Sequence, residues 1–112
     1  MNANFSSAVA DYWESPGTVS IIDRNLHQLE IQTVCRHLLP TDRIADVGCG
    51  NGEATIQYAA KVSHATGFER SGNMRAQAIA AGQNSGAGNL DFKGGDILQM
   101  RDLDGQFDVV VS

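Results

Sequence analysis

Three closely spaced glycines in a turn between two regular elements constrain the fold of this chain more than any other feature. Gly48, Gly50 and Gly52 follow the short, mostly apolar segment 44–47 and precede the segment 53–62, whose apolar residues recur at a helical period. A short apolar run that ends at glycine indicates a strand, whereas the second pattern indicates a helix. Glycine has no Cβ, so the backbone here is able to turn tightly and to approach a bound molecule. This order predicts an open parallel sheet with a ligand beyond its strand ends.

The rest of the chain repeats the alternation of strand and helix. Strands that alternate with helices pair in parallel through right-handed crossovers. The predicted fold class is therefore α/β, with a Rossmann-like, doubly wound and mostly parallel sheet. The further predicted elements are strands at 65–68, 90–93 and 107–112, a helix at 72–81 that Ser71 caps, and a loop at 82–89.

The N-terminal part, residues 1–40, is predicted to be a separate helical segment. A short helix and a loop are expected within 5–22, followed by a helix that Asp23 caps and that stops before Pro40. Tyr12 and Trp13 lie in the first of these stretches. Their aromatic side chains are expected either to pack the helix or to cover a bound ligand, and packing is the simpler expectation.

Acidic residues stand at the exits of the second and third predicted strands. Glu69 follows the strand 65–68, and Asp96, with Ile97 after it, follows the strand 90–93. A carboxylate is an acceptor for two hydroxyls, so Glu69 is suited to both hydroxyls of a ribose. Asp96 is suited to the exocyclic amine of adenine, and the Ile97 backbone to a ring nitrogen. Each carboxylate alone is typical of a solvated loop, but together with the glycine turn they indicate a nucleoside site.

Two classes of nucleoside ligand fit this pattern. The G-x-G-x-x-G/A pattern of NAD-binding proteins requires glycine or alanine at the position of Glu53. The backbone N–H groups at the opening of the helix are expected to face the ligand, and a carboxylate there repels a pyrophosphate. It is compatible with a ligand that carries an amino-acid moiety and a sulfonium cation. The nicotinamide dinucleotide remains the less favoured alternative.

Four motifs resemble those of class I S-adenosylmethionine-dependent methyltransferases. IADVGCGNGEAT resembles the first motif of that family, GFERSGNM the second, KGGDILQM the third and FDVVVS the fourth strand. Ser71 and Met74 match residues often found in the second motif, where this chain has Glu69 in place of the usual aspartate. Arg70 departs from the family, which usually places an apolar residue against the adenine.

The resemblance implies that S-adenosyl-L-methionine is the cofactor and that a methyl group passes from its sulfonium to an unidentified acceptor. Residues 41–112 are then the cofactor-binding half of an incomplete methyltransferase domain, and the chain alone is expected to be inactive. A cofactor-binding protein without catalytic activity remains an alternative. No catalytic base is identified. The implied cofactor-binding residues are Asp46, Gly48, Cys49, Gly50, Asn51, Gly52, Glu69, Arg70, Asp96 and Ile97.

Composition limits the partners and the compartment. The formal net charge is −5 and the basic residues are scattered, which favours a small-molecule acceptor and gives no indication of nucleic acid. No apolar stretch suits a membrane span, no metal-ligand spacing is present, and two unpaired cysteines favour the cytoplasm. The apolar run Val109–Val111 suits a strand with neighbours on both sides, so we expect a sheet truncated after this strand and self-association through its open edge.

Overall fold

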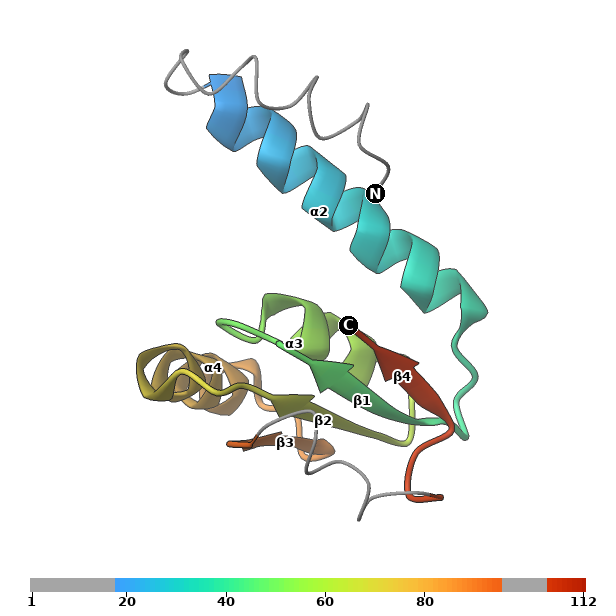
Figure 1. The fold of residues 1–112 in the computed structure, drawn as a ribbon. Coiled ribbons are helices and arrows are strands. Elements are labelled where there is room, and N and C mark those ends of the chain that lie inside the picture. The colour runs from blue at the N-terminus through green and yellow to red at the C-terminus, as the bar shows by residue number, and fades with distance from the viewer. Residues whose placement is uncertain (1–17, 96–104) are drawn as a thin grey trace. The chain divides into compact units, whose positions relative to one another are not determined.

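The computed structural model describes residues 18–95 and 105–112 (Figure 1). Contacts divide the chain into two compact units, Met1–Thr33 and Val34–Ser112. The predicted division after residue 40 stays a prediction. The elements are helix α2 (Thr18–His37), strand β1 (Arg43–Val47), helix α3 (Glu53–Ala59), strand β2 (His64–Phe68), helix α4 (Gly72–Ser85), strand β3 (Leu90–Lys93) and strand β4 (Val109–Val111).

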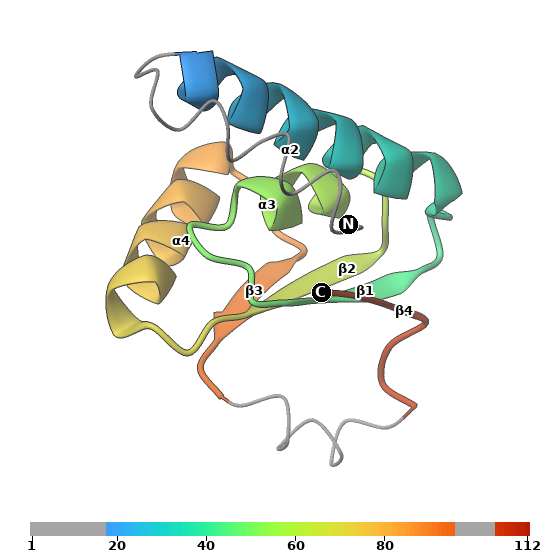
Figure 2. The same cartoon turned by 45° about the horizontal axis from the view of Figure 1, so that its top comes forward.

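The four strands form one parallel sheet in the order β3-β2-β1-β4. From β1 the chain steps to β2 and then to β3 in one direction, whereas β4 pairs with the other side of β1. Because both crossovers in the first direction are right-handed, α3 and α4 lie on the same face of the sheet (Figure 2). The reversal of direction beside β1 is the position at which doubly wound sheets bind ligands. The predicted Rossmann-like α/β fold is confirmed.

Phe92 of β3 is enclosed by glycines from the elements around it. A Cβ on Gly67 of β2 would lie 2.7 Å from the Phe92 ring, and one on Gly52, before α3, would lie 2.8 Å from it. A Cβ on Gly82 of α4 would lie 3.1 Å from the same ring. Side chains at the first two positions would overlap the ring, and one at the third would crowd it. The missing side chains therefore allow α3, α4 and β2 to close around a single aromatic ring.

Helix α4 is longer than the sequence predicted. It continues to Ser85 and ends at Gly86, whose φ of 74° gives a left-handed cap. The predicted loop from Gly82 to Asn89 is therefore wrong over its first four residues. Gly82 stays helical because Phe92 and Leu90 occupy the space beside it, so close packing outweighs the low helix propensity of glycine.

The other helix boundaries also differ from the prediction. Helix α3 ends at Ala59, before the predicted residue 62, and the Asn89 side-chain amide donates hydrogen bonds to the carbonyls of Ala59 (2.8 Å) and Val62 (3.1 Å). Asn89 thus satisfies carbonyls that a longer helix would have used. Helix α2 begins at Thr18, so Asp23 lies inside it and is not its N-cap. After Pro16 and Gly17 the sequence contains no proline or glycine until Pro40, so a helix is able to begin at Thr18.

Replacing Gly52 with alanine should cost more stability than the same change at Gly48. Both glycines have positive φ, 83° and 72°, so alanine at either position costs about 1–2 kcal/mol of conformational strain. A Cβ at Gly48 meets no atom within 4 Å, whereas one at Gly52 overlaps Phe92 and costs about 1–3 kcal/mol more. Urea denaturation of the two variants measures the difference. Equal losses of unfolding free energy would contradict the packing of Phe92.

Candidate functional site

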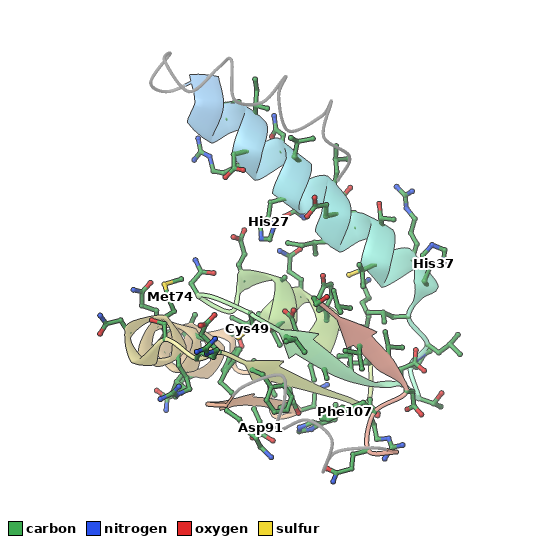
Figure 3. All side chains as sticks on the ribbon, in the orientation of Figure 1. His27, His37, Cys49, Met74, Asp91 and Phe107 are labelled. Carbon is green, nitrogen blue, oxygen red and sulfur yellow. The ribbon has the colours of Figure 1, made fainter. Side chains whose placement is uncertain are left out.

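The exits of β1 and β2 lie side by side and are joined by hydrogen bonds. The Phe68 carbonyl at the end of β2 accepts from the N–H groups of Gly48 (2.8 Å) and Cys49 (3.1 Å), which follow β1. Figure 3 shows Cys49 and Met74, the latter from the first turn of α4, at this end of the sheet. The structure thus brings the glycine turn and the β2 exit together, as the sequence predicted.

The glycine turn depends on its glycines for its backbone conformation. Gly48, Gly50 and Gly52 all have positive φ, with values of 72°, 58° and 83°. Residues with a Cβ rarely adopt these angles. Ordinary contact distance, 3.5 Å, would separate a Cβ on Gly50 from the Met74 methyl carbon. The glycines therefore allow the backbone conformation of the turn, and they contribute no side chains that would cover its outer surface.

Five backbone N–H groups of the turn already have partners within the protein. The N–H groups that open α3 were expected to face the ligand, and two of the five, those of Gly52 and Glu53, are bonded within the turn instead. A phosphate-binding loop needs several free N–H groups that converge on the anion, and these five are not free. The bonds run from Gly48 and Cys49 to the Phe68 carbonyl, from Gly50 to Glu69 Oε1, from Gly52 to the Cys49 carbonyl and from Glu53 to Asn51 Oδ1.

The Glu69 carboxylate links the turn to the start of α4. Its Oε1 accepts from Gly50 N (2.9 Å) and its Oε2 from Ser71 N (2.8 Å). These backbone bonds, first from Ser71 and then from Gly50, hold the pKa of the Glu69 carboxyl below its usual range. A carboxylate oxygen has two acceptor positions. The carboxylate therefore keeps acceptor capacity for a further donor, and the charged form is secured at neutral pH.

Asp46 lies beneath the turn and bonds to α3. Its side chain is buried, and its Oδ2 accepts from Thr55 Oγ1 at 2.7 Å. Thr55 is itself fully buried. This bond fixes the end of β1 to the second residue after the start of α3. The cofactor contact expected of Asp46 stays a prediction. Thr55 was not predicted, because its only signal was a hydroxyl on an otherwise apolar helical face.

Cys49 contributes a small apolar side chain to the turn. Burial, together with the nearby Asp46 and Glu69 carboxylates, raises the pKa of its thiol to about 11. The sulfur also lies in the space beside Gly67, where a Cβ would come within 2.8 Å of it. Since the thiolate is the nucleophilic form, this cysteine is protonated and suited to packing.

The remaining predicted site residues fall into two groups. Asn51 and Arg70 are exposed beside the two strand exits. Asp96 and Ile97 lie outside the described residues, as do Tyr12 and Trp13. A residue that the sequence analysis missed completes the site: Arg75 donates from Nη1 to the Glu69 carbonyl at 2.8 Å.

Metal sites, membrane spans and cavities were considered within the described residues. Within residues 18–95 and 105–112 no cluster of His, Cys, Asp or Glu is suited to a metal ion. No helix in those ranges has both the length and the apolarity for a membrane crossing. A cavity of about 290 Å³ lies away from the strand exits, between α4 and β3, and contains none of the predicted site residues. It is lined by Ile79, Gly82, Gln83, Ala87, Leu90, Asp91 and Phe92.

A family model described as a methyltransferase domain matches residues 44–112. The chain belongs to the methyltransferase domain family. The match begins at β1 and includes the glycine turn and Glu69, so the family predicted from the motifs is confirmed.

Individual methyltransferases resemble the chain over limited segments. Over 63 residues it is 44% identical to a trans-aconitate 2-methyltransferase of Streptomyces avermitilis, covering 52% of this chain and 23% of that protein. Over 58 residues it is 34% identical to a 23S rRNA (uracil(1939)-C(5))-methyltransferase of Methylococcus capsulatus, covering 52% of this chain and 13% of that protein.

A SAM-dependent methyltransferase of Thiobacillus denitrificans, crystallised with S-adenosyl-L-homocysteine, matches with a TM-score of 0.51 and 27% identity. This match covers 59% of this chain and 28% of that one. The chain spans less than a third of each relative.

Replacing Thr55 with valine should destabilise this methyltransferase domain by about 1–3 kcal/mol, because the buried Asp46 carboxylate loses a donor. Serine at position 55 keeps the hydroxyl and removes one methyl group, at a cost of about 0.8 kcal/mol. Urea denaturation of the two variants measures both costs. A valine variant as stable as the parent would show that the Asp46–Thr55 bond contributes nothing.

Proposed function

We propose that this chain binds S-adenosyl-L-methionine at the exits of β1 and β2, and that the whole protein is a methyltransferase. The observation that carries the proposal is the Glu69 carboxylate, which backbone donors orient while acceptor capacity remains on it. This capacity suits the two hydroxyls of a ribose. The S-adenosyl-L-homocysteine in the crystal structure from Thiobacillus denitrificans supports the same ligand class.

The glycine turn and its surroundings suit the other end of the ligand. The exposed Gly48 and the half-buried Gly50 leave room for an amino-acid moiety, and the acidic groups of Asp46 and Glu69 favour a sulfonium cation nearby. Arg70, Asp96 and Ile97 are proposed to complete the adenine end. When bound, the cofactor supplies the electrophilic methyl carbon. The residues of this chain hold and orient it, which is the main contribution of a protein to such a transfer.

The alternative ligands fit less well. The five bonded N–H groups at the turn reduce the number of donors open to a pyrophosphate, and Glu53 adds a carboxylate at the opening of α3. A protein that binds the cofactor without transferring a methyl group would have the same cofactor site as an enzyme and would differ from it only in lacking turnover. We propose the enzyme, because the relatives that the chain matches are named as methyltransferases.

The acceptor proposed is a small molecule, and the proposed compartment is the cytoplasm. The net charge of −5 does not favour a nucleic-acid surface. The relative with 44% identity is named for trans-aconitate, a small acid, whereas the rRNA methyltransferase is 34% identical. Cys35 and Cys49 are free thiols, which suits a reducing compartment. The side chain of Val110 on β4, 62% exposed, supports the expected self-association through that strand.

Replacing Glu69 with alanine should weaken S-adenosyl-L-homocysteine binding by about 1.5–3 kcal/mol, the scale of hydrogen bonds to a charged group. Aspartate at position 69 keeps the carboxylate one methylene further back and should cost less. Glu30→Ala, which removes an exposed carboxylate from α2, is the matched control and should bind like the parent. Titration calorimetry measures all four proteins. Parent-like affinity in both Glu69 variants would exclude Glu69 from the site.

A further inference from the structure

Arg75 spans the exits of two strands from its position near the start of α4. Its side chain is half-buried, and its Nη1 donates to the backbone carbonyl of Glu69, after β2, at 2.8 Å. The same guanidinium covers Gly94, after β3. A Cβ on Gly94 would lie 2.8 Å from Nη1, 3.1 Å from Cζ and 3.6 Å from Nη2. The guanidinium therefore occupies the space that a side chain at position 94 would need.

The contacts of Arg75 fix the backbone that carries the Glu69 carboxylate. The Glu69 N–H donates to the Lys93 carbonyl at 3.0 Å, and the Glu69 carbonyl accepts from Arg75. Both backbone polar groups of Glu69 are thus held, one by β3 and one by α4. The direction of the carboxylate depends on this backbone, because the side chain leaves it through a single Cα–Cβ bond.

We propose that Arg75 is a positioning residue for the nucleoside half of the cofactor, acting through the Glu69 carbonyl and the Gly94 backbone. This inference rests on the proposed function. The guanidinium bridges the backbone that follows β2 and β3, and the ribose and the adenine are proposed to lie beside these two exits. Arginine suits this role because its planar fork donates a hydrogen bond at its edge while its surface packs on a backbone without a side chain.

The first test compares Arg75→Ala, Arg75→Lys and the control Arg36→Ala, which removes an exposed arginine from α2. The probes are S-adenosyl-L-homocysteine and 5′-methylthioadenosine, which keeps the nucleoside and lacks the amino-acid moiety. Arg75→Ala should weaken both probes by the same factor, about tenfold, the scale of one hydrogen bond to a charged group. Arg75→Lys keeps a donor and should recover most of the affinity. Arg36→Ala should bind like the parent.

The second test is a double-mutant cycle with Gly94→Ala. In the parent background the new Cβ displaces the guanidinium and should weaken both probes. In the Arg75→Ala background the space is free, so the same change should have little effect. If Arg75 contributed only to overall stability, Gly94→Ala would change the affinity for each probe by the same factor in the two backgrounds. If Arg75→Ala does not fold, Arg75→Lys replaces it in the cycle, because an ammonium group does not cover Gly94 as the guanidinium does.

A ligand-free measurement separates this inference from the proposed function. The Gly50 N–H bonds to Glu69 Oε1, so its amide proton resonance should move in Arg75→Ala and return towards the parent position in Arg75→Lys. A parent chain that binds neither probe would refute the proposed function, while this resonance would still test the hold of Arg75 on Glu69. Parent-like binding in Arg75→Ala, equal factors in the cycle, or an unmoved Gly50 resonance would overturn the positioning role.

Discussion

The ring of Phe92 fills a space that exists because neighbouring positions lack side chains. Gly52 and Gly67 would each place a Cβ within 2.8 Å of that ring, and Gly82 would place one at 3.1 Å. These glycines belong to the turn before α3, to β2 and to α4, so their contact with one ring sets how closely both helices approach the sheet. The positions of the glycine turn and of the start of α4 follow from this packing, and the candidate site lies between them.

The Glu69 carboxylate connects that packing to a ligand. It accepts one N–H from the glycine turn and one from the residue that caps α4, so it holds the two sides of the site together before any ligand arrives. The remaining acceptor capacity suits paired hydroxyls. Since the other bonded N–H groups of the turn point to protein acceptors, fewer donors are open to an anion there, and the Glu69 carboxylate adds a negative charge. This polarity suits a cationic sulfonium ligand.

Local patterns in the sequence predicted most of the sheet and the centre of the site. The strand before the glycine turn, the turn itself and the carboxylate of Glu69 each depend on residues close in sequence. The features that the sequence did not reveal depend on distant contacts. The sequence predicted a loop from Gly82 onwards, because the contact that requires glycine there is with the Phe92 ring on a different element. Arg75 was missed because both of its partners, the Glu69 carbonyl and the Gly94 backbone, are main-chain groups without a side-chain signature. Asp96 and Ile97 stay predictions.

The most direct test of the proposed site is a titration of the isotopically labelled chain with S-adenosyl-L-homocysteine, followed by amide chemical shifts. Saturable shifts should appear at residues 48–52 and 69–71, where the glycine turn and the Glu69 carboxylate meet. NAD should produce no saturable shifts there, because the five bonded N–H groups and the Glu53 carboxylate at the opening of α3 disfavour its pyrophosphate. Shifts confined to the cavity between α4 and β3, or an equal response to NAD, would contradict the assignment of the cofactor to the exits of β1 and β2.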